Sequence, residues 1–132
     1  MNRLSQEERR IVLQRVTQAL VEQHSIEFAY AYGSFVDGPG FRDIDVAIWT
    51  TGDAMEPVDL TLGIALTRIA DYPVDVRIIN QAPVPFLFHV LRGQPLIVRD
   101  ERHLADLIES TARTYHDRIP LTRQAVREAF AG

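Results

Sequence analysis

The sequence predicts an α/β (α+β) domain in which helices pack around one small mixed β-sheet. Helix-like and strand-like segments alternate along most of the 132 residues, and this order is typical of a domain built around a single mixed sheet. The strand-like segments are short runs rich in apolar, β-branched and aromatic residues. A chain of this length is expected to form one domain, residues 1–132, that is large enough for a hydrophobic core.

The first half of the chain is expected to form a helix, two strands and a second helix. Ser5 and Glu8 match a capping box, in which a serine and the glutamate three residues later cap each other's backbone amides. Apolar residues then recur at helical spacing, so a helix is expected over about 6–23. After it we expect a strand over 26–32, a loop over 33–41, a strand over 44–49 and a helix from Pro57 to about residue 70.

The second half of the chain is expected to end in helices. We expect a strand over 74–79, a short helix over 84–91, a strand over 95–99 and a helix from 101 to about 118. Pro120 separates that helix from a last helical segment over 121–130, whose apolar stripe consists of Leu121, Ala125, Val126, Ala129 and Phe130. This stripe either packs on its own domain or docks a partner, so residues 101–132 form a C-terminal helical segment that is a candidate partner surface.

The composition excludes several kinds of chemistry. The absence of cysteine excludes disulfides, zinc–thiolate sites and cysteine nucleophiles, and the absence of lysine excludes Schiff bases and a P-loop lysine. The net charge of −4 disfavours a nucleic-acid substrate, because a phosphate backbone usually needs a basic face. No apolar run approaches the ~20 residues that span a bilayer, and the N-terminus lacks the apolar core of a signal peptide. We therefore expect a cytoplasmic protein without a membrane partner.

Three aspartates are the strongest functional signal in the sequence. Asp43 and Asp45 lie two residues apart at the start of an expected strand, so their side chains share one face of it. Asp75 lies at the start of the expected strand over 74–79. In the strand over 44–49, the residues that alternate with Asp45 and face the other side are apolar, namely Ile44, Val46 and Ile48. If the two strands are neighbours, three carboxylates converge and repel one another. A hard divalent ion such as magnesium would relieve that repulsion, since it prefers oxygen ligands.

Gly33 and Ser34 follow directly after the expected strand over 26–32. Glycine allows the backbone to approach a ligand closely, and backbone amides together with a serine hydroxyl can hold phosphate oxygens. The same pair is also common in turns that have only a structural role. Ser34 is not expected to be a hydrolase nucleophile, because its neighbours do not form the Gly-x-Ser-x-Gly motif.

The order of these motifs resembles that of the nucleotidyltransferase superfamily of DNA polymerase beta. More closely, it is similar to the minimal nucleotidyltransferase (MNT) antitoxins of type VII MNT/HEPN toxin–antitoxin systems. Residues 30–35, 41–48 and 73–77 carry the resemblance, which extends to 82–86 and 98–100. It implies a nucleotidyltransferase fold, with helices mainly on one face of the sheet and the catalytic carboxylates on the other.

The resemblance also implies a role for each motif. Gly33 and Ser34 would hold the nucleotide phosphates, and Asp43 and Asp45 would bind two magnesium ions. Asp75 would bind one of these ions and serve as, or assist, the base on the acceptor hydroxyl. Family members with this layout transfer AMP from ATP to a tyrosine of a partner HEPN-domain RNase toxin, which silences the toxin. The resemblance thus implies an ATP-dependent protein adenylyltransferase that forms a hetero-oligomer with its toxin.

The sequence departs from the family pattern at the loop after Gly33. Many relatives carry an arginine there, where this chain has Asp37, and the loop to Asp43 is slightly shorter. Loss of a charged hydrogen bond to the triphosphate would cost about 1–3 kcal/mol of binding. Arg42 and Arg77 are the candidates to replace it; Arg42 is otherwise a solvated residue, and Arg77 either contacts phosphate or pairs with a carboxylate.

Two other functions stay open at this point. One is a non-catalytic antitoxin that neutralises its toxin by binding alone, which the missing arginine favours. The other is a nucleotidyltransferase for a small molecule such as an antibiotic, although such enzymes usually carry an extra substrate domain. Trp49 either stacks on a nucleotide base or packs in a core or interface, whereas Tyr30 and Tyr32 are expected to pack in the sheet.

Overall fold

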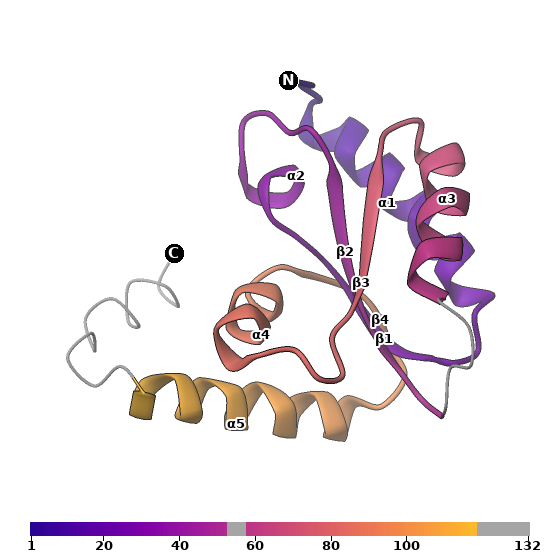
Figure 1. Cartoon of the computed structure of the whole chain (residues 1–132). Coiled ribbons are helices and arrows are strands. Elements are labelled where there is room, and N and C mark those ends of the chain that lie inside the picture. The colour runs from indigo at the N-terminus through magenta and orange to yellow at the C-terminus, as the bar shows by residue number, and fades with distance from the viewer. Residues whose placement is uncertain (53–57, 119–132) are drawn as a thin grey trace.

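The computed structural model describes residues 1–52 and 58–118 (Figure 1). In chain order the elements are α1 (Gln6–Val21), β1 (Ile26–Tyr32), α2 (Ser34–Asp37), β2 (Ile44–Thr50), α3 (Val58–Ala70), β3 (Val74–Ile78), α4 (Val84–Leu91), β4 (Gln94–Val98) and α5 (Glu101–Arg118). The expected mixed α/β fold is confirmed. No helix within the described residues has the length and apolar character needed to cross a membrane.

One element was missing from the sequence-based expectation. Residues 33–41 are not a loop throughout, because Ser34–Asp37 forms the short helix α2. The capping box at α1 is confirmed, since Ser5 Oγ accepts a hydrogen bond from the Glu8 amide at 3.1 Å and Glu8 Oε1 accepts one from the Ser5 amide at 3.0 Å. Pro57 and the helical segment expected over 121–130 lie outside the described residues.

The four strands form one mixed sheet in the order β3-β2-β1-β4. β1 pairs antiparallel with both β2 and β4, whereas β2 and β3 run parallel. The chain therefore leaves β1 and enters β2 and β3 at the same end of the sheet. Gly33 follows β1 at that end, and the three aspartates lie at the starts of β2 and β3.

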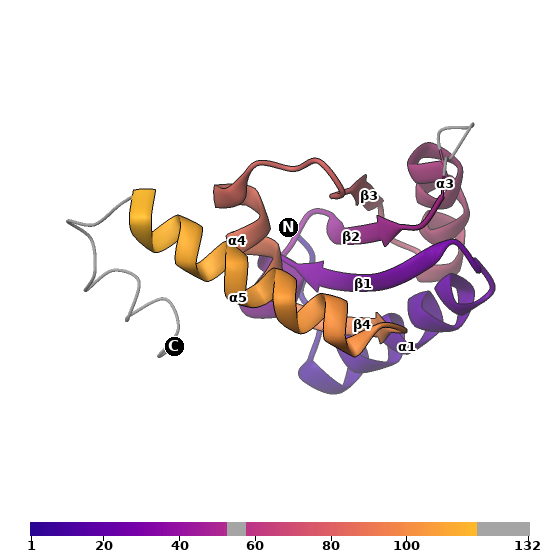
Figure 2. The same ribbon diagram turned by 90° about the horizontal axis from the view of Figure 1, so that it is seen from below.

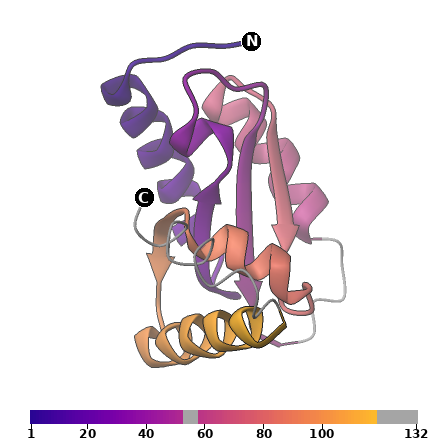
Figure 3. The same cartoon turned by 90° about the vertical axis from the view of Figure 1, so that its left-hand side faces the viewer.

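Helices lie on both faces of the sheet. α1 and α3 cover one face, where Ile44, Val46 and Ile48 are fully buried in the larger core cluster (Figures 1 and 2). α4 and α5 pack over part of the other face, on a smaller cluster that includes Ala47 and Leu104 (Figure 3). Residues of the same parity as Ala47 in β2 project toward this second face, so the carboxylate of Asp45 lies on the face opposite α1 and α3. Asp43 lies just before β2.

Aromatic rings and a polar contact connect α5 to the sheet. His103 Nδ1 contacts the carboxylate of Glu27, and its ring lies edge-on to Trp49 with the centroids 5.0 Å apart. Trp49 in turn stacks on Phe28 at 5.5 Å. Of the two roles open for Trp49, the structure therefore supports packing. Tyr30 and Tyr32 are buried in the sheet as expected.

Candidate functional site

The strand register brings two of the expected site residues together. Asp45 of β2 is the direct partner of Asp75 in β3, and on its other side it is the partner of Tyr32 in β1. Adjacent strands are about 4.8 Å apart, so the two carboxylates leave the same face as immediate neighbours. A hydrogen bond of 2.8 Å from the Ile44 amide to the Pro73 carbonyl sets this register at the start of both strands. The two strands are therefore neighbours, which was the condition for the carboxylates to come together.

The electrostatics of Asp45 show that the charges of both other acids act on it. Burial raises the pKa of the Asp45 carboxyl, and the nearby charges of Asp75 and Asp43 raise it further. The positive charges of Arg77 and His89 lower that pKa to a smaller extent. The ionised form of Asp45 is therefore disfavoured where it lies, and a cation placed among the three carboxylates would favour it.

The chemistry of these donors suits a hard divalent cation, because all three are carboxylates. Within the part of the chain that the structure describes, however, no three acidic or histidine side chains are gathered closely enough to form a ready metal site. Asp75 is turned to Arg77, whose Nε lies 3.2 Å from Asp75 Oδ2. Metal binding at this site thus requires the carboxylates to turn toward a common point.

Arg77 was expected either to contact phosphate or to pair with a carboxylate, and in this structure it pairs with Asp75. Its guanidinium also lies over the ring of Phe86, 5.6 Å from the centroid. About half of each side chain of the ion pair is exposed, so the pair is open to solvent and to exchange of partners. Arg42 is exposed at the entrance to β2.

Gly33 holds the loop against the acids in a conformation that requires glycine. Its φ is 79° and its ψ is −158°, a region that other residues rarely adopt. A Cβ added there would lie 2.7 Å from Asp45 Oδ2. The Gly33 carbonyl accepts hydrogen bonds from the amides of Val36 and Asp37 and so starts α2. Ser34 is exposed in the first turn of that helix.

Arg9 is a residue of this region that the sequence reasoning missed. Its guanidinium donates to the carbonyls of Phe35 (2.9 Å), Gly38 (2.7 Å) and Pro39 (3.0 Å), and so spans the carbonyl side of the loop after Gly33. It also lies 5.7 and 5.6 Å from the ring centroids of Phe35 and Phe41. A signal was present in the sequence, because Arg9 lies four residues before Leu13 and seven before Val16, on the buried stripe of α1.

Tyr32 and His89 complete the surroundings of Asp45. Burial, and after it the charge of Asp45, raises the pKa of Tyr32 to about 12. His89 of α4 packs edge-on against the Tyr32 ring at 5.5 Å. No pattern in the sequence singled out His89, since its place depends on how α4 folds back over the sheet.

Comparison with known proteins identifies the class to which this fold and these residues belong. Residues 14–102 match the family model described as Polymerase beta, Nucleotidyltransferase, so the chain belongs to that nucleotidyltransferase family. No curated protein matches the sequence.

Solved structures with the same fold come from toxin–antitoxin complexes. A chain of the complex described as tri-AMPylated Shewanella oneidensis HEPN toxin with MNT antitoxin is 17% identical with a TM-score of 0.67; the match covers 94% of this chain and 99% of that one. A chain of the toxin–antitoxin MntA–HepT structure is 16% identical (TM-score 0.66, 93% and 99% covered). A chain of a toxin–antitoxin structure with AMP-PNP is 20% identical (TM-score 0.62, 97% and 100% covered). At these identities the likeness shows a shared fold, that of the minimal nucleotidyltransferase antitoxins.

Proposed function

We propose that this chain is an antitoxin that transfers AMP from ATP to a tyrosine hydroxyl of a cognate HEPN-domain RNase toxin. One observation carries the proposal: Asp45 and Asp75 are register partners, and the glycine-dependent turn at Gly33 lies against Asp45 at the same end of the sheet. The fold likeness to complexes of MNT antitoxins with HEPN toxins supports the choice of partner. The acidic net charge of −4 agrees with a protein acceptor rather than a nucleic acid. We place the reaction in the cytoplasm and in a single minimal domain.

Each residue has a stated task in this proposal. Gly33 and Ser34 hold the phosphates of ATP, and Asp43, Asp45 and Asp75 are the side chains that would hold two magnesium ions. Magnesium bound there would neutralise charge on the triphosphate and on the leaving group. Asp75 also orients the acceptor hydroxyl and takes its proton.

The reaction is a single displacement at phosphorus. The tyrosine oxygen forms a bond to the α-phosphorus of ATP, the bond from that phosphorus to the bridging oxygen of the β-phosphate breaks, and pyrophosphate leaves. The phenolic proton goes to Asp75. Because Asp75 bears a salt bridge to Arg77 in the free protein, release from Arg77 makes its carboxylate available as a proton acceptor.

A second function, neutralisation by binding alone, also has specific support. The arginine expected after Gly33 is replaced by Asp37, and Asp75 is held by Arg77 rather than facing a shared ligand point with the other acids. A chain in this state could still cover its toxin.

Mass spectrometry of the co-expressed toxin separates the two functions. We expect one or more AMP groups on a toxin tyrosine with the wild-type chain and none with Asp43→Ala combined with Asp45→Ala. Glu22→Ala combined with Glu101→Ala is the matched control, because it removes two exposed carboxylates away from the site and should leave the modification unchanged. An unmodified toxin that the aspartate double variant still neutralises would establish binding alone and refute the enzymatic proposal.

A further inference from the structure

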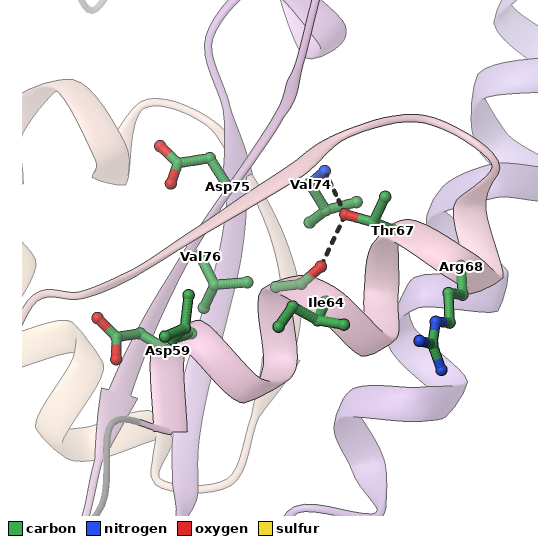
Figure 4. Close-up of a pocket in the computed structure, with 9 residues that line it drawn as sticks. Asp59, Ile64, Thr67, Arg68, Val74, Asp75 and Val76 are labelled. Atoms are coloured by element: carbon green, nitrogen blue, oxygen red, sulfur yellow. Dashed lines mark hydrogen bonds between the residues drawn. The ribbon is translucent and has the colours of Figure 1, made fainter.

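A groove runs between helix α3 and the outer edge of strand β3 (Figure 4). It has a volume of about 500 Å³, and its walls include Leu60, Gly63 and Ile64 from α3 and Val74 and Val76 from β3. Asp75 belongs to the same lining. We call this feature the α3–β3 groove. Because Asp75 is part of its lining, the α3–β3 groove adjoins the candidate site, although the proposed reaction assigns no role to the groove.

The strand wall of the groove is an open sheet edge. β3 is the last strand of the sheet formed by the described residues. The bonds from the Ile44 amide to Pro73 and from the Ile79 amide to Ile48 show that the odd-numbered residues of β3 pair with β2. The backbone groups of Val74 and Val76 therefore point into the groove. Thr67 Oγ1 accepts the Val74 amide at 3.0 Å, which leaves Val76 at the centre of the edge, where an extended chain can add as a further strand.

The helix wall of the groove is apolar and exposed. Leu60 is 64% exposed and Ile64 is 54% exposed, although both are large aliphatic residues on adjacent turns of α3. Between them Gly63 brings the helix so near the strand that a Cβ there would lie 3.3 Å from the Val74 carbonyl oxygen. Adjacent exposed aliphatic side chains are typical of an interaction site. A strand added to β3 would direct every second side chain onto Leu60 and Ile64.

The remaining side chains of such a strand would lie on the face that carries Asp75. Figure 4 shows the Asp75 carboxylate directed away from α3, on the far side of the β3 ribbon. Cross-strand neighbours on one face lie about 4.5–5.5 Å apart, and diagonal neighbours at about 7–8 Å are within reach of aromatic side chains. A tyrosine in the added strand therefore comes within reach of Asp75. Asp59 also belongs to the groove lining, and its negative charge favours arginine or lysine beside that tyrosine.

We propose that the α3–β3 groove binds the acceptor segment of the partner protein in extended form, as a strand added to the free edge of β3. The segment places an apolar side chain on Leu60 and Ile64, its tyrosine on the Asp75 face, and a basic side chain near Asp59. This inference rests on the proposed function, because it assigns Asp75 to the acceptor hydroxyl. It makes β3 both the carrier of the proton acceptor and the template that positions the substrate protein.

The test measures partner binding and nucleotide binding separately, with purified cognate HEPN protein. Ile64→Arg introduces a cation into the apolar wall; because Ile64 is exposed, the variant is expected to fold, which circular dichroism checks. We expect it to weaken partner binding and raise the KM for the partner by about tenfold or more, which corresponds to the loss of one buried aliphatic contact. The Kd for ATP should stay unchanged. Ile11→Arg on α1, where Ile11 is 38% exposed, is the matched control and should change neither quantity.

Hydrogen exchange gives a second readout that depends on backbone pairing. The amide of Val76 should gain protection when the partner binds, because it would then donate to the added strand. Unchanged partner affinity in Ile64→Arg, or no gain of protection at Val76, would overturn the groove assignment even where AMP transfer proceeds normally. The groove assignment would also be overturned if the wild-type chain self-associates, and if Ile64→Arg abolishes this self-association but leaves partner binding intact. The groove would then bind a second copy of the chain. A wild-type chain that binds its partner through the groove but transfers no AMP would instead refute the enzymatic function alone.

Discussion

Arg9→Ala is expected to destabilise the chain, because Arg9 connects α1 to the loop after Gly33 through several hydrogen bonds. Arg9 ties the first helix to the loop after Gly33, 24 or more residues further along the chain, through three hydrogen bonds of 2.7 to 3.0 Å to backbone carbonyls. A further bond, from Nε to the Leu4 carbonyl at 3.1 Å, fixes the guanidinium itself. Alanine removes all of these donors and leaves the loop carbonyls without their partner.

The size of the effect follows from the number and the exposure of these bonds. A hydrogen bond from a charged donor contributes about 1.5–3 kcal/mol when it is buried, and the half-buried position of Arg9 reduces this to about 1 kcal/mol for each of three bonds. Contact with the faces of Phe35 and Phe41 adds about 0.5–1 kcal/mol. The free energy of unfolding should therefore fall by about 3–4 kcal/mol, which is a large part of the 5–15 kcal/mol that typical domains possess.

Urea denaturation followed by circular dichroism measures this loss. Arg10→Ala is the matched control. Arg10 is the next residue of the same helix, but among the described residues its guanidinium pairs only with exposed Glu7, so its removal should have no measurable effect. Arg9→Lys keeps the charge without the planar fork and should recover only a minor part of the stability. If Arg9→Ala unfolds at the same urea concentration as Arg10→Ala, the reasoning that the loop depends on this guanidinium is refuted.

Three further predictions concern the site. Gly33→Ala should abolish nucleotide binding, because the alanine is strained at φ 79° and its Cβ meets Asp45. Gly52→Ala is the control: its φ is 78° and, its two chain neighbours aside, no atom of the described residues lies within 4 Å of the added Cβ, so it should show the strain alone. Equal nucleotide affinity in the two variants, measured by calorimetry, would contradict this prediction. The pKa of Asp45 is raised in the folded chain, so protonation of this carboxyl favours the folded state. That contribution to the free energy of unfolding is fully present below the unfolded pKa of about 3.9 and is lost as pH rises through the folded pKa. Asp45→Asn should therefore raise the Tm of the metal-free protein at pH 7 but not near pH 3, and a lower Tm at pH 7 would disprove it. Asp75→Asn should fold with an unreduced Tm in EDTA. The change removes one of three neighbouring negative charges, and the ion pair with Arg77 that it also removes is exposed. A large drop in Tm, measured by scanning fluorimetry, would count against the site.

The strands were predictable because alternation along a single strand is a local property. Ile44, Val46 and Ile48 on one parity and Asp43 and Asp45 on the other already separate a buried face from a functional one. The pairing of Asp45 with Asp75 was only conditional, because it depends on β2 and β3 being parallel neighbours, and a connecting helix allows that arrangement without requiring it.

The loop after Gly33 was not predictable for a physical reason of another kind. Gly38-Pro39-Gly40 indicates irregular backbone, and a helix as short as Ser34–Asp37 shows no periodicity of its own. What supports α2 is tertiary: Phe35 is 1% exposed and packs edge-on against Phe41 at 4.6 Å, and Arg9 reaches the carbonyls from α1. Neither contact can be read from spacing within the loop.

These contacts separate two tasks that an arginine at position 37 could perform, namely support of the loop and binding of phosphate. Arg9 supports the loop, so the loop does not need an arginine at position 37 to keep its shape. All three guanidinium nitrogens of Arg9 are engaged with backbone carbonyls, however, so Arg9 supplies no cation to a triphosphate. Arg77 is a basic residue that acts on the charge of Asp45 and is also bonded to Asp75. Support of the loop and recognition of phosphate, which one loop arginine could combine, are therefore separate tasks in this chain. In the proposed reaction, Arg77 has to release Asp75 before that carboxylate can accept a proton.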